Sequence, residues 1–320
     1  MLFRSVNKPA GYTSHDVVAR VRRWSGQRQV GHAGTLDPQA TGVLPIALGF
    51  CTRMLEWVPE PKVYEADVVF GITTTTYDAE GDVVAERPTT GLSQAALEAA
   101  LTPFVGEAVL QQPPAYSAVK VDGKRSYQLA REGTPTPPPA RPVRVYSVEV
   151  IDFDAPTARL RVVCGKGMYV RSLAHDVGEA LGCGAHLSGL VRTQNGPFAI
   201  EQSYTLEELE GRLPSDPASV LLGSGFPFPH WPSIRLNDEK LRKVMTGSTL
   251  FLTVAELWPA KPLVVAGITV PSDLHHCLAY GPDGQVLAVL ERVSGSTAWR
   301  PAKVFPAGMA DSAVAVTSGT

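Results

Sequence analysis

A short loop near the N-terminus gathers the side chains best suited to chemistry. The run from Gly31 to Gly42 reads GHAGTLDPQATG and holds three glycines, one histidine (His32) and one aspartate (Asp37). Glycine-rich backbone can turn sharply and lets another molecule approach closely. The segment is too irregular for a helix and too rich in glycine and proline for a central strand. The composition therefore predicts a loop that presents the Asp37 carboxylate.

The Asp-Pro step in this loop also has a plainer interpretation. An aspartate before a proline often accepts hydrogen bonds from nearby backbone N–H groups and so stabilises a turn. The dipeptide Asp37-Pro38 alone favours that structural interpretation over a catalytic one. The other motifs of the chain have to decide between the two.

Two amphipathic helices are predicted to hold the loop and its surroundings. Ser14 is expected to cap a helix that runs to about Trp24, with Val17, Val18 and Val21 beside Trp24 on one buried stripe. Three arginines of this helix lie largely off that stripe. The helix should therefore give the loop a basic neighbour.

The second helix is predicted from about residue 169 to residue 181, after the turn Gly165-Lys166-Gly167. Its core stripe leaves Arg171 in the first turn and off the stripe. A helix N-terminus favours anions, so an arginine there needs another partner. We expect Asp37 to be that partner.

Strands are predicted between these helices. Residues 64–70 alternate as a half-buried strand does, and the pattern alone makes Tyr64 a core residue. Residues 73–82 carry several acids, but Val83 and Thr89 stand where a calcium-binding EF-hand loop needs glycine and glutamate. We interpret that segment as a polar hairpin loop. Other expected elements are strands at 2–6, 105–110, 115–121, 143–153 and 158–164, and helices at 93–101 and 124–132.

Composition excludes several classes of protein. With 44% apolar and 19% charged residues, the chain is close to globular averages and unlike a disordered protein. The N-terminus lacks a long apolar segment and no apolar run reaches about 18 residues, so we expect a cytoplasmic protein that does not enter a membrane. The four cysteines show no C-x-x-C pair, which predicts buried free thiols and neither a metal site nor disulfides.

The net charge of −2 argues against a nucleic-acid-binding protein until the charges are mapped along the chain. Residues 120–144 hold six lysines and arginines against two acids, whereas residues 78–107 are acidic. A segregated distribution can form a basic surface without a basic total. Ordinary solvated charged faces are the alternative.

A proline-rich stretch at 227–232 marks the best domain boundary. We expect an α+β fold: a catalytic domain at 1–228, with a mixed, largely antiparallel sheet and flanking helices, and a small β-rich domain at 229–306. The latter should hold a helix at 238–245 and strands near 249–254, 263–270, 276–281 and 285–292. Residues 307–320 are predicted to be a disordered tail.

Several further motifs occur in collinear order over most of residues 3–193. They are Gly31 to Gly49, KVYEA at 62–66, PPAYSAVK at 113–120, Gly123-Lys124, Arg141-Pro142, GKGMYVRS at 165–172 and GCGAHL at 182–187. Together these segments resemble the tRNA pseudouridine-55 synthases of bacteria. One departure is Asn7 before Lys8-Pro9, where the family usually has aspartate.

The resemblance implies roles for individual residues. Asp37 would be the catalytic carboxylate, Arg171 would keep it ionised and oriented, and Tyr64 would pack against the target uracil. His32 would fill the space left when the base flips out. The remaining RNA-binding candidates are Lys8, Lys120, Lys124 and Arg141 as phosphate contacts, and Tyr169 at the pocket.

The resemblance also implies the substrate and partners. The expected activity is isomerisation of uridine 55 in the T-loop of tRNA, without cofactor, metal or guide RNA, by a monomer with an RNA-binding PUA-like domain at its C-terminus. Guide-RNA-dependent relatives in archaea and eukaryotes typically carry long basic extensions, which are absent here. A tRNA-binding folding factor, for which modification is incidental, is the alternative function.

Overall fold

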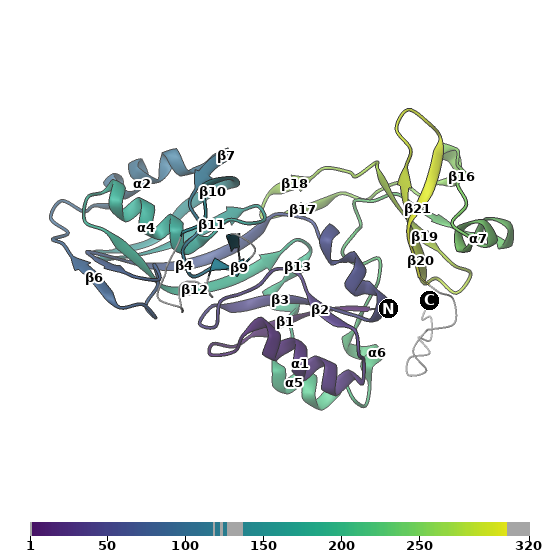
Figure 1. The fold of residues 1–320 in the computed structure, drawn as a ribbon, viewed down its shortest axis with the longest axis horizontal. Coiled ribbons are helices and arrows are strands. Elements are labelled where there is room, and N and C mark those ends of the chain that lie inside the picture. The colour runs from purple at the N-terminus through teal and green to yellow at the C-terminus, as the bar shows by residue number, and fades with distance from the viewer. Residues whose placement is uncertain (1, 118, 122–123, 127–136, 306–320) are drawn as a thin grey trace. The chain divides into compact units, whose positions relative to one another are not determined.

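The computed structural model describes residues 2–117, 119–121, 124–126 and 137–305 (Figure 1). The chain forms two compact units, which both contain segments distant in sequence. The first unit comprises residues 1–38, 42–59 and 194–320, and the second comprises residues 39–41 and 60–193. The predicted α+β class, with largely antiparallel strands, is confirmed.

In the first unit, β1 (Leu2–Lys8) pairs antiparallel with β3 (Thr41–Leu48) and with the short β14 (Leu222–Gly223). β2 (Val30–His32) pairs with the other end of β3, from Val30 opposite Leu48 to His32 opposite Ile46. Seven of the eight residues of β3 are buried, which explains its almost uninterrupted apolar sequence. The Asp37 loop connects β2 to β3.

Helix α1 (Ser14–Ser25) covers this part of the sheet, and its start differs from the prediction by one residue. Thr13 is the N-cap and forms a reciprocal capping box with Asp16, whereas Ser14 is the first helical residue. Gly26 ends the helix with a φ of 65°. The three predicted core valines are buried, while Trp24 is only half-buried. The unit also contains η1 (Gly49–Trp57), β13 (Phe198–Ala199), η3 (Ile200–Gln202), α5 (Leu206–Arg212) and α6 (Pro217–Val220).

The C-terminal part of the first unit is a five-stranded sheet with the strand order β15-β19-β20-β21-β16. Helix α7 (Asp238–Met245) has the predicted limits. The strands β15 and β21 were not predicted. The elements are β15 (Ser233–Arg235), β16 (Leu250–Phe251), η4 (Val254–Glu256), β17 (Leu263–Val265), β18 (Ile268–Val270), β19 (His276–Tyr280), β20 (Val286–Arg292) and β21 (Ala298–Val304).

One hydrophobic cluster joins this sheet to the N-terminal segments of the same unit. Phe3 and Met54 share it with Val289 and Phe305, and all four are fully buried. Trp57 lies within 5.3 Å of the His276 ring, measured between ring centroids. The predicted division of the chain at residue 228 thus crosses a shared core, and the division itself stays a prediction.

The second unit is built on strands in the order β12-β4-β11-β10-β7. β4 (Lys62–Phe70) alternates between buried and half-buried residues, as predicted, and pairs along its length with β11 (Thr157–Cys164). β11 pairs with β10 (Arg141–Asp154), which also pairs with β7 (Gly106–Gln111). β12 spans Ala185–Asn195, and its last two residues belong to the first unit.

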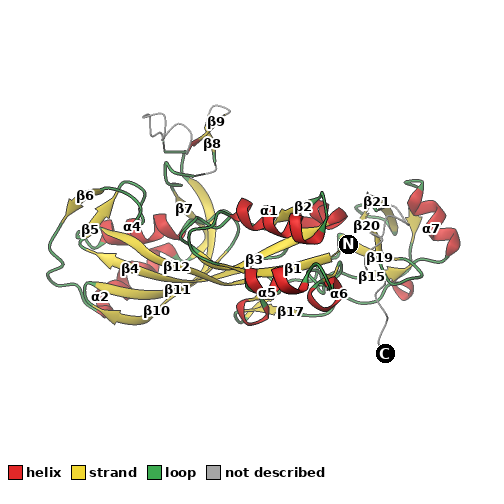
Figure 2. Ribbon diagram, turned by 90° about the horizontal axis from the view of Figure 1, so that it is seen from below, coloured by secondary structure: helices red, strands yellow, loops and turns green. Residues whose placement is uncertain are grey.

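Among its described residues, the second unit also contains the helices α2 and α4 and two hairpins (Figure 2). α2 (Gln94–Leu101) is capped by Ser93 as predicted and continues into η2 (Thr102–Phe104), and α4 spans Val170–Ala180. One hairpin joins β5 (Ile72–Thr74) to β6 (Val83–Glu86). The other joins β8 (Lys120–Val121) to β9 (Lys124–Arg125), and Figure 2 shows it standing away from the large sheet.

The β8–β9 hairpin corrects two sequence predictions. The strand expected over 115–121 is confined to its last two residues, because residues 115–117 form a bend. Of the helix expected over 124–132, Lys124 and Arg125 form β9 instead, Ser126 is helical, and residues 127–132 lie outside the described part of the chain.

All four cysteines are buried free thiols, as predicted. Burial raises the pKa of Cys51, Cys164 and Cys277 to about 12, so these thiols are protonated and unreactive at neutral pH. Within the described residues, none of the helices combines the length and apolar character needed to cross a membrane.

Candidate active site

Buried donors fix the backbone immediately before Asp37. The hydroxyl of Ser14, at the start of α1, donates to the carbonyl of Leu36 at 3.1 Å and accepts from its N–H at 2.9 Å. Ser14 is 2% exposed and Leu36 is 4% exposed, so water does not compete for these bonds. Ser14, which was expected to cap the helix, therefore holds the backbone of the Asp37 loop instead.

The backbone immediately after Asp37 is fixed by a buried ammonium group. The carbonyl of Pro38 accepts from Nζ of Lys8 at 2.9 Å and from the N–H of Gly11 at 3.0 Å. Lys8 also donates to the carbonyls of Pro9 and Tyr12, at 2.9 and 2.7 Å. Lys8 is 0% exposed, so the phosphate contact predicted for it is not supported, and its role is to brace the loop.

The start of the loop is held from a third direction. The N–H of Ala33 donates to the carbonyl of Pro45, and the buried side-chain amide of Asn195 donates to the carbonyl of Ala33, both at 2.9 Å. Gly34 and Gly42 adopt φ values of 84° and 97°, which side chains other than glycine rarely tolerate. The loop thus presents the half-buried Asp37 from a backbone held at three points.

His32 lies at the end of β2, at the entrance to the same loop. Its half-buried ring contacts the ring of His15 on α1 edge to face, with centroids 6.2 Å apart and planes at 78°. Helix α1 thus contacts the loop at two places. Ser14 bonds Leu36, next to Asp37, and His15 contacts His32.

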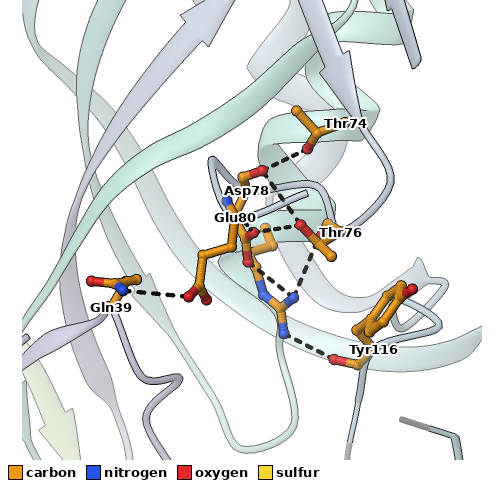
Figure 3. Close-up of polar contacts among 7 residues, drawn as sticks. Gln39, Thr74, Thr76, Asp78, Glu80 and Tyr116 are labelled. Atoms are coloured by element: carbon orange, nitrogen blue, oxygen red, sulfur yellow. Dashed lines mark hydrogen bonds and ion pairs between the residues drawn. The ribbon is translucent and has the colours of Figure 1, made fainter. Parts of the chain in front are cut away.

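Arg171 is buried in the first turn of α4, at 5% exposure, although it lies off the predicted core stripe. Its Nη1 lies 3.2 Å from Oδ2 of Asp78 and donates to the carbonyl of Thr76 at 3.1 Å. Its Nη2 donates to the carbonyl of Tyr116 at 3.2 Å. Figure 3 shows how these groups converge on the guanidinium. A buried cation needs such partners, because it has lost its hydration.

Asp78 is itself held by its own loop. Its Oδ1 accepts from the hydroxyl of Thr76 at 2.5 Å and from the N–H of Glu80 at 3.1 Å, and its carbonyl accepts from the hydroxyl of Thr74 at 2.6 Å. Sequence reasoning assigned this segment to a polar hairpin loop and missed its role. No local pattern indicates that role, because the partner of Asp78 is an arginine distant in sequence.

The predicted pair between Asp37 and Arg171 joins residues of different units and stays a prediction. The chain enters the second unit two residues after Asp37, at Gln39. There the amide of Gln39 donates to the carboxylate of Glu80 at 3.3 Å, and Glu80 is two residues from Asp78 (Figure 3).

Tyr64 lies near the start of β4 and is 7% exposed. The guanidinium carbon of Arg192, a fully buried residue, lies 6.0 Å from the centre of the Tyr64 ring. This distance permits a cation–π attraction that holds the ring in place. Burial alone fits the core interpretation of Tyr64 as well as the functional one.

Tyr169 forms the N-cap of α4, and the side chain of Gln111 fixes its backbone. The amide of Gln111 donates to the carbonyl of Tyr169 at 3.0 Å and accepts from its N–H at 2.8 Å. Arg141 lies 5.7 Å from the centre of the Tyr169 ring and donates to the carbonyl of Gly167 at 2.9 Å. Both predicted RNA contacts therefore lie together at the start of α4, and both are half-buried.

Lys120 and Lys124 lie on opposite strands of the β8–β9 hairpin. Lys120 pairs with Arg125, and Val121 pairs with Lys124, so three of the four paired residues are basic. The phosphate contacts predicted for Lys120 and Lys124 stay a prediction. Among the residues that the structure describes, no group of three or more histidines, cysteines or acids could hold a metal ion.

Known proteins match the chain over both units. The family model described as TruB family pseudouridylate synthase (N terminal domain) matches residues 22–170. The model described as tRNA pseudouridylate synthase B C-terminal domain matches residues 171–217. Among solved structures, the Cbf5 chain of a Cbf5-Nop10-Gar1 complex superposes with a TM-score of 0.68 and 26% identity, covering 95% of this chain and 85% of that one.

Curated relatives match at higher identity. The tRNA pseudouridine synthase B of Thermobifida fusca is 42% identical over 309 residues, which cover 94% of this chain and 97% of the relative. The enzyme of the same name from Geobacillus kaustophilus is 45% identical over 259 residues, or 77% of this chain and 90% of the relative. The chain therefore belongs to the TruB family of pseudouridylate synthases.

Proposed function

We propose that this enzyme isomerises uridine 55 in the T-loop of tRNA to pseudouridine, and that Asp37 is the catalytic carboxylate. The observation that carries the proposal is the rigid presentation of Asp37. Buried groups bond the backbone on both sides of it, at Leu36 and at Pro38, while the carboxylate-bearing residue itself is half-buried. A turn-stabilising aspartate would not need such bracing from Ser14 and Lys8.

The reaction demands little beyond a well-placed carboxylate. The C1′–N1 bond of the uridine breaks, the uracil turns, and a C1′–C5 bond forms, while C5 loses a proton and N1 gains one. The atoms balance without an oxidant, a reductant or an energy source. An ionised carboxylate can stabilise the electron-poor sugar or attack it, as in glycosidases. Asp37 supplies that group.

The second unit supports the chemistry through Arg171 and Tyr64. Arg171 would hold the Asp37 carboxylate ionised and oriented by charge-assisted hydrogen bonds. The carboxylate of Asp78, whose Oδ2 lies 3.2 Å from Nη1 of Arg171, would balance the guanidinium charge and orient it for this task. Tyr64, steadied by Arg192, would stack on the flipped uracil.

Base flipping and backbone contacts explain the remaining residues. A uracil inside a folded T-loop has to leave its stack, at a cost of roughly a few kcal/mol, and His32 would occupy the space that it leaves. Arg141, beside Tyr169, and the β8–β9 hairpin with Lys120 and Lys124 would contact phosphates. The C-terminal sheet would act as the PUA-like RNA-binding part.

The enzyme is proposed to act alone. Relatives that match nearly the whole chain are named as tRNA pseudouridine synthases, which favours a tRNA substrate read without guide RNA. The structural neighbour that assembles with Nop10 and Gar1 is much less similar in sequence, at 26% identity. We further expect a monomer that works in the cytoplasm, where tRNA is processed.

The proposal is tested with an isolated T-arm. A hairpin of the T-stem and loop should become pseudouridylated at the position of uridine 55, because enzymes of this kind read local shape and loop bases. The matched control is the same hairpin with cytidine at that position, which should bind and remain unmodified. Binding without any pseudouridine in either RNA would favour the folding-factor alternative.

A further inference from the structure

One face of α4 holds the β5–β6 hairpin at three successive turns. Arg171, His175 and Glu179 are spaced by four residues, so their side chains lie in a row on the helix. Arg171 binds Asp78 and His175 stacks on Tyr77, both in the hairpin loop. Glu179 pairs with Arg87, just after β6, at 2.9 Å. All of these residues belong to the second unit.

Tyr77 has an unusual backbone conformation. Its φ is 64°, in the left-handed region that bulky residues avoid because the Cβ atom crowds the carbonyl. The residues on either side of it, Thr76 and Asp78, both bind Arg171, one through its carbonyl and the other through its carboxylate. The left-handed turn at Tyr77 is what allows two nearby groups to face the same guanidinium.

Several contacts hold Tyr77 in this conformation. Its ring stacks on the imidazole of His175, with centroids 3.9 Å apart and planes at 11°. Its carbonyl accepts from the N–H of Leu187 at 3.0 Å, and the N–H of Ala79 donates to the carbonyl of Leu187 at 3.0 Å. The loop is therefore gripped by α4 through side chains and by β12 through its backbone.

Both stacked rings are in an environment that favours their uncharged forms. Burial lowers the pKa of His175, against the opposing effect of Glu179, which favours a neutral imidazole. Burial, followed by Asp176 and Glu179, raises the pKa of Tyr77, which favours a protonated phenol. Two neutral rings add no charge beside Arg171 and so leave its pairing with Asp78 undisturbed.

We propose that Tyr77 and His175 are positioning residues for pseudouridine formation, and that their stack fixes the hairpin loop so that Thr76 and Asp78 hold Arg171 in its working orientation. The inference rests on the proposed function and extends it to two residues to which the sequence assigned no role. Without the stack, the strained turn can relax, and the two acceptors no longer converge on the guanidinium. A misplacement of about 1 Å at a catalytic group can lower a rate about a hundredfold.

The test compares pairs of variants in single-turnover assays on the T-arm hairpin. His175→Ala and Tyr77→Gly remove one ring each, and glycine also leaves residue 77 free to adopt other backbone conformations, so nothing replaces the stack in holding the turn. Each should lower the rate at saturating RNA about ten- to hundredfold, with the KM nearly unchanged. His175→Phe and Tyr77→Phe retain a ring and should restore most of the rate.

Glu179→Gln is the matched control, because it weakens the contact between the same helix face and the far end of the hairpin. It should leave the single-turnover rate within about twofold of the wild type, because this exposed ion pair contributes little. Thermal melting of every variant confirms that the proteins compared are folded.

Several results would overturn the inference. These are a wild-type rate in folded His175→Ala and Tyr77→Gly, no rescue by the two phenylalanine variants, a change confined to the KM, or an equal loss in Glu179→Gln. A wild-type enzyme that makes no pseudouridine in the hairpin would instead contradict the proposed function. The two failures are therefore distinguishable.

Discussion

The loop that carries Asp37 and the clamp around Arg171 solve the same problem, holding one charged group still, by opposite means. Around Asp37 the protein fixes the backbone, through Ser14, Lys8 and Asn195, and leaves the acidic residue half-buried. Around Arg171 it buries the charged side chain and surrounds it with acceptors. The first arrangement suits a group that must meet a substrate, and the second suits a group that orients another.

The difference also explains why sequence reasoning found one arrangement and missed most of the other. The Asp37 loop is local, and its glycines and proline lie within one short run. The clamp draws its acceptors from Thr76, Asp78 and Tyr116, which become neighbours of Arg171 only through the fold.

Asp37→Asn should abolish turnover while leaving RNA affinity nearly unchanged. The amide keeps the size of the side chain and much of its hydrogen bonding, but it cannot serve as an anionic catalyst. We expect a rate loss of about 10⁴-fold or more, as for other catalytic groups that act as a unit. Pseudouridine yield and RNA binding are measured on the same folded preparation. Substantial residual activity, with wild-type contamination excluded, would return Asp37 to a turn-stabilising role.

Asp78→Asn should slow the reaction about a hundredfold without abolishing it. Arg171 would keep its two carbonyl acceptors but lose the carboxylate of Asp78, so its orientation would loosen. Asp82→Asn, the same change on an exposed acid of the same loop, is the control and should react at the wild-type rate. Equal rates for both variants in single-turnover assays would show that Asp78 does not matter to the site.

Lys8→Met should destabilise the first unit. The change leaves the carbonyls of Pro9 and Tyr12 without this donor, at about 1–3 kcal/mol for each group that stays unsatisfied, while the carbonyl of Pro38 keeps the N–H of Gly11. We expect a loss of at least about 2 kcal/mol in the free energy of unfolding, measured by denaturant titration. Lys243→Met, on an exposed ion pair of α7, should cost under about 1 kcal/mol. If Lys8→Met is as stable as the wild type, Lys8 does not hold the backbone of the Asp37 loop.

Arg141→Gln should weaken RNA binding modestly and reduce its dependence on salt. Loss of one phosphate contact lowers the slope of log affinity against log salt by about one. Arg159→Gln, which removes an exposed arginine paired with Asp67, should leave that slope unchanged. If both variants give the same slope, Arg141 only supports the turn at Gly167 and the Tyr169 ring.

Much of the fold followed from local pattern. The alternation in β4, the Ser93-capped α2 and the limits of α7 could be predicted because each reflects burial or capping within a few residues. The failures lie where distant segments decide. The strand expected at 115–121 is a bend where the carbonyl of Tyr116 turns to Arg171, and Ser14 binds Leu36 rather than capping its helix.

The candidate site divides in the same way. Asp37, His32, Tyr64 and Arg171 could be selected from the sequence by residue type and by resemblance. That Lys8 is a buried brace, and that Tyr77 stacks on His175, could not, because burial and ring stacking depend on which segments the fold brings together. From the sequence alone, Lys8 is predicted to contact phosphate. Only the structure shows that it donates to the carbonyls of Pro9, Tyr12 and Pro38.

The most direct test of the account is to incubate an unmodified tRNA transcript with the purified chain alone and to map every pseudouridine that forms. We expect one new pseudouridine, at position 55 in the T-loop, formed without guide RNA, a partner protein or an added cofactor, and absent with Asp37→Asn. Pseudouridine at another position, or its formation only after a guide RNA or partner protein is added, would contradict it.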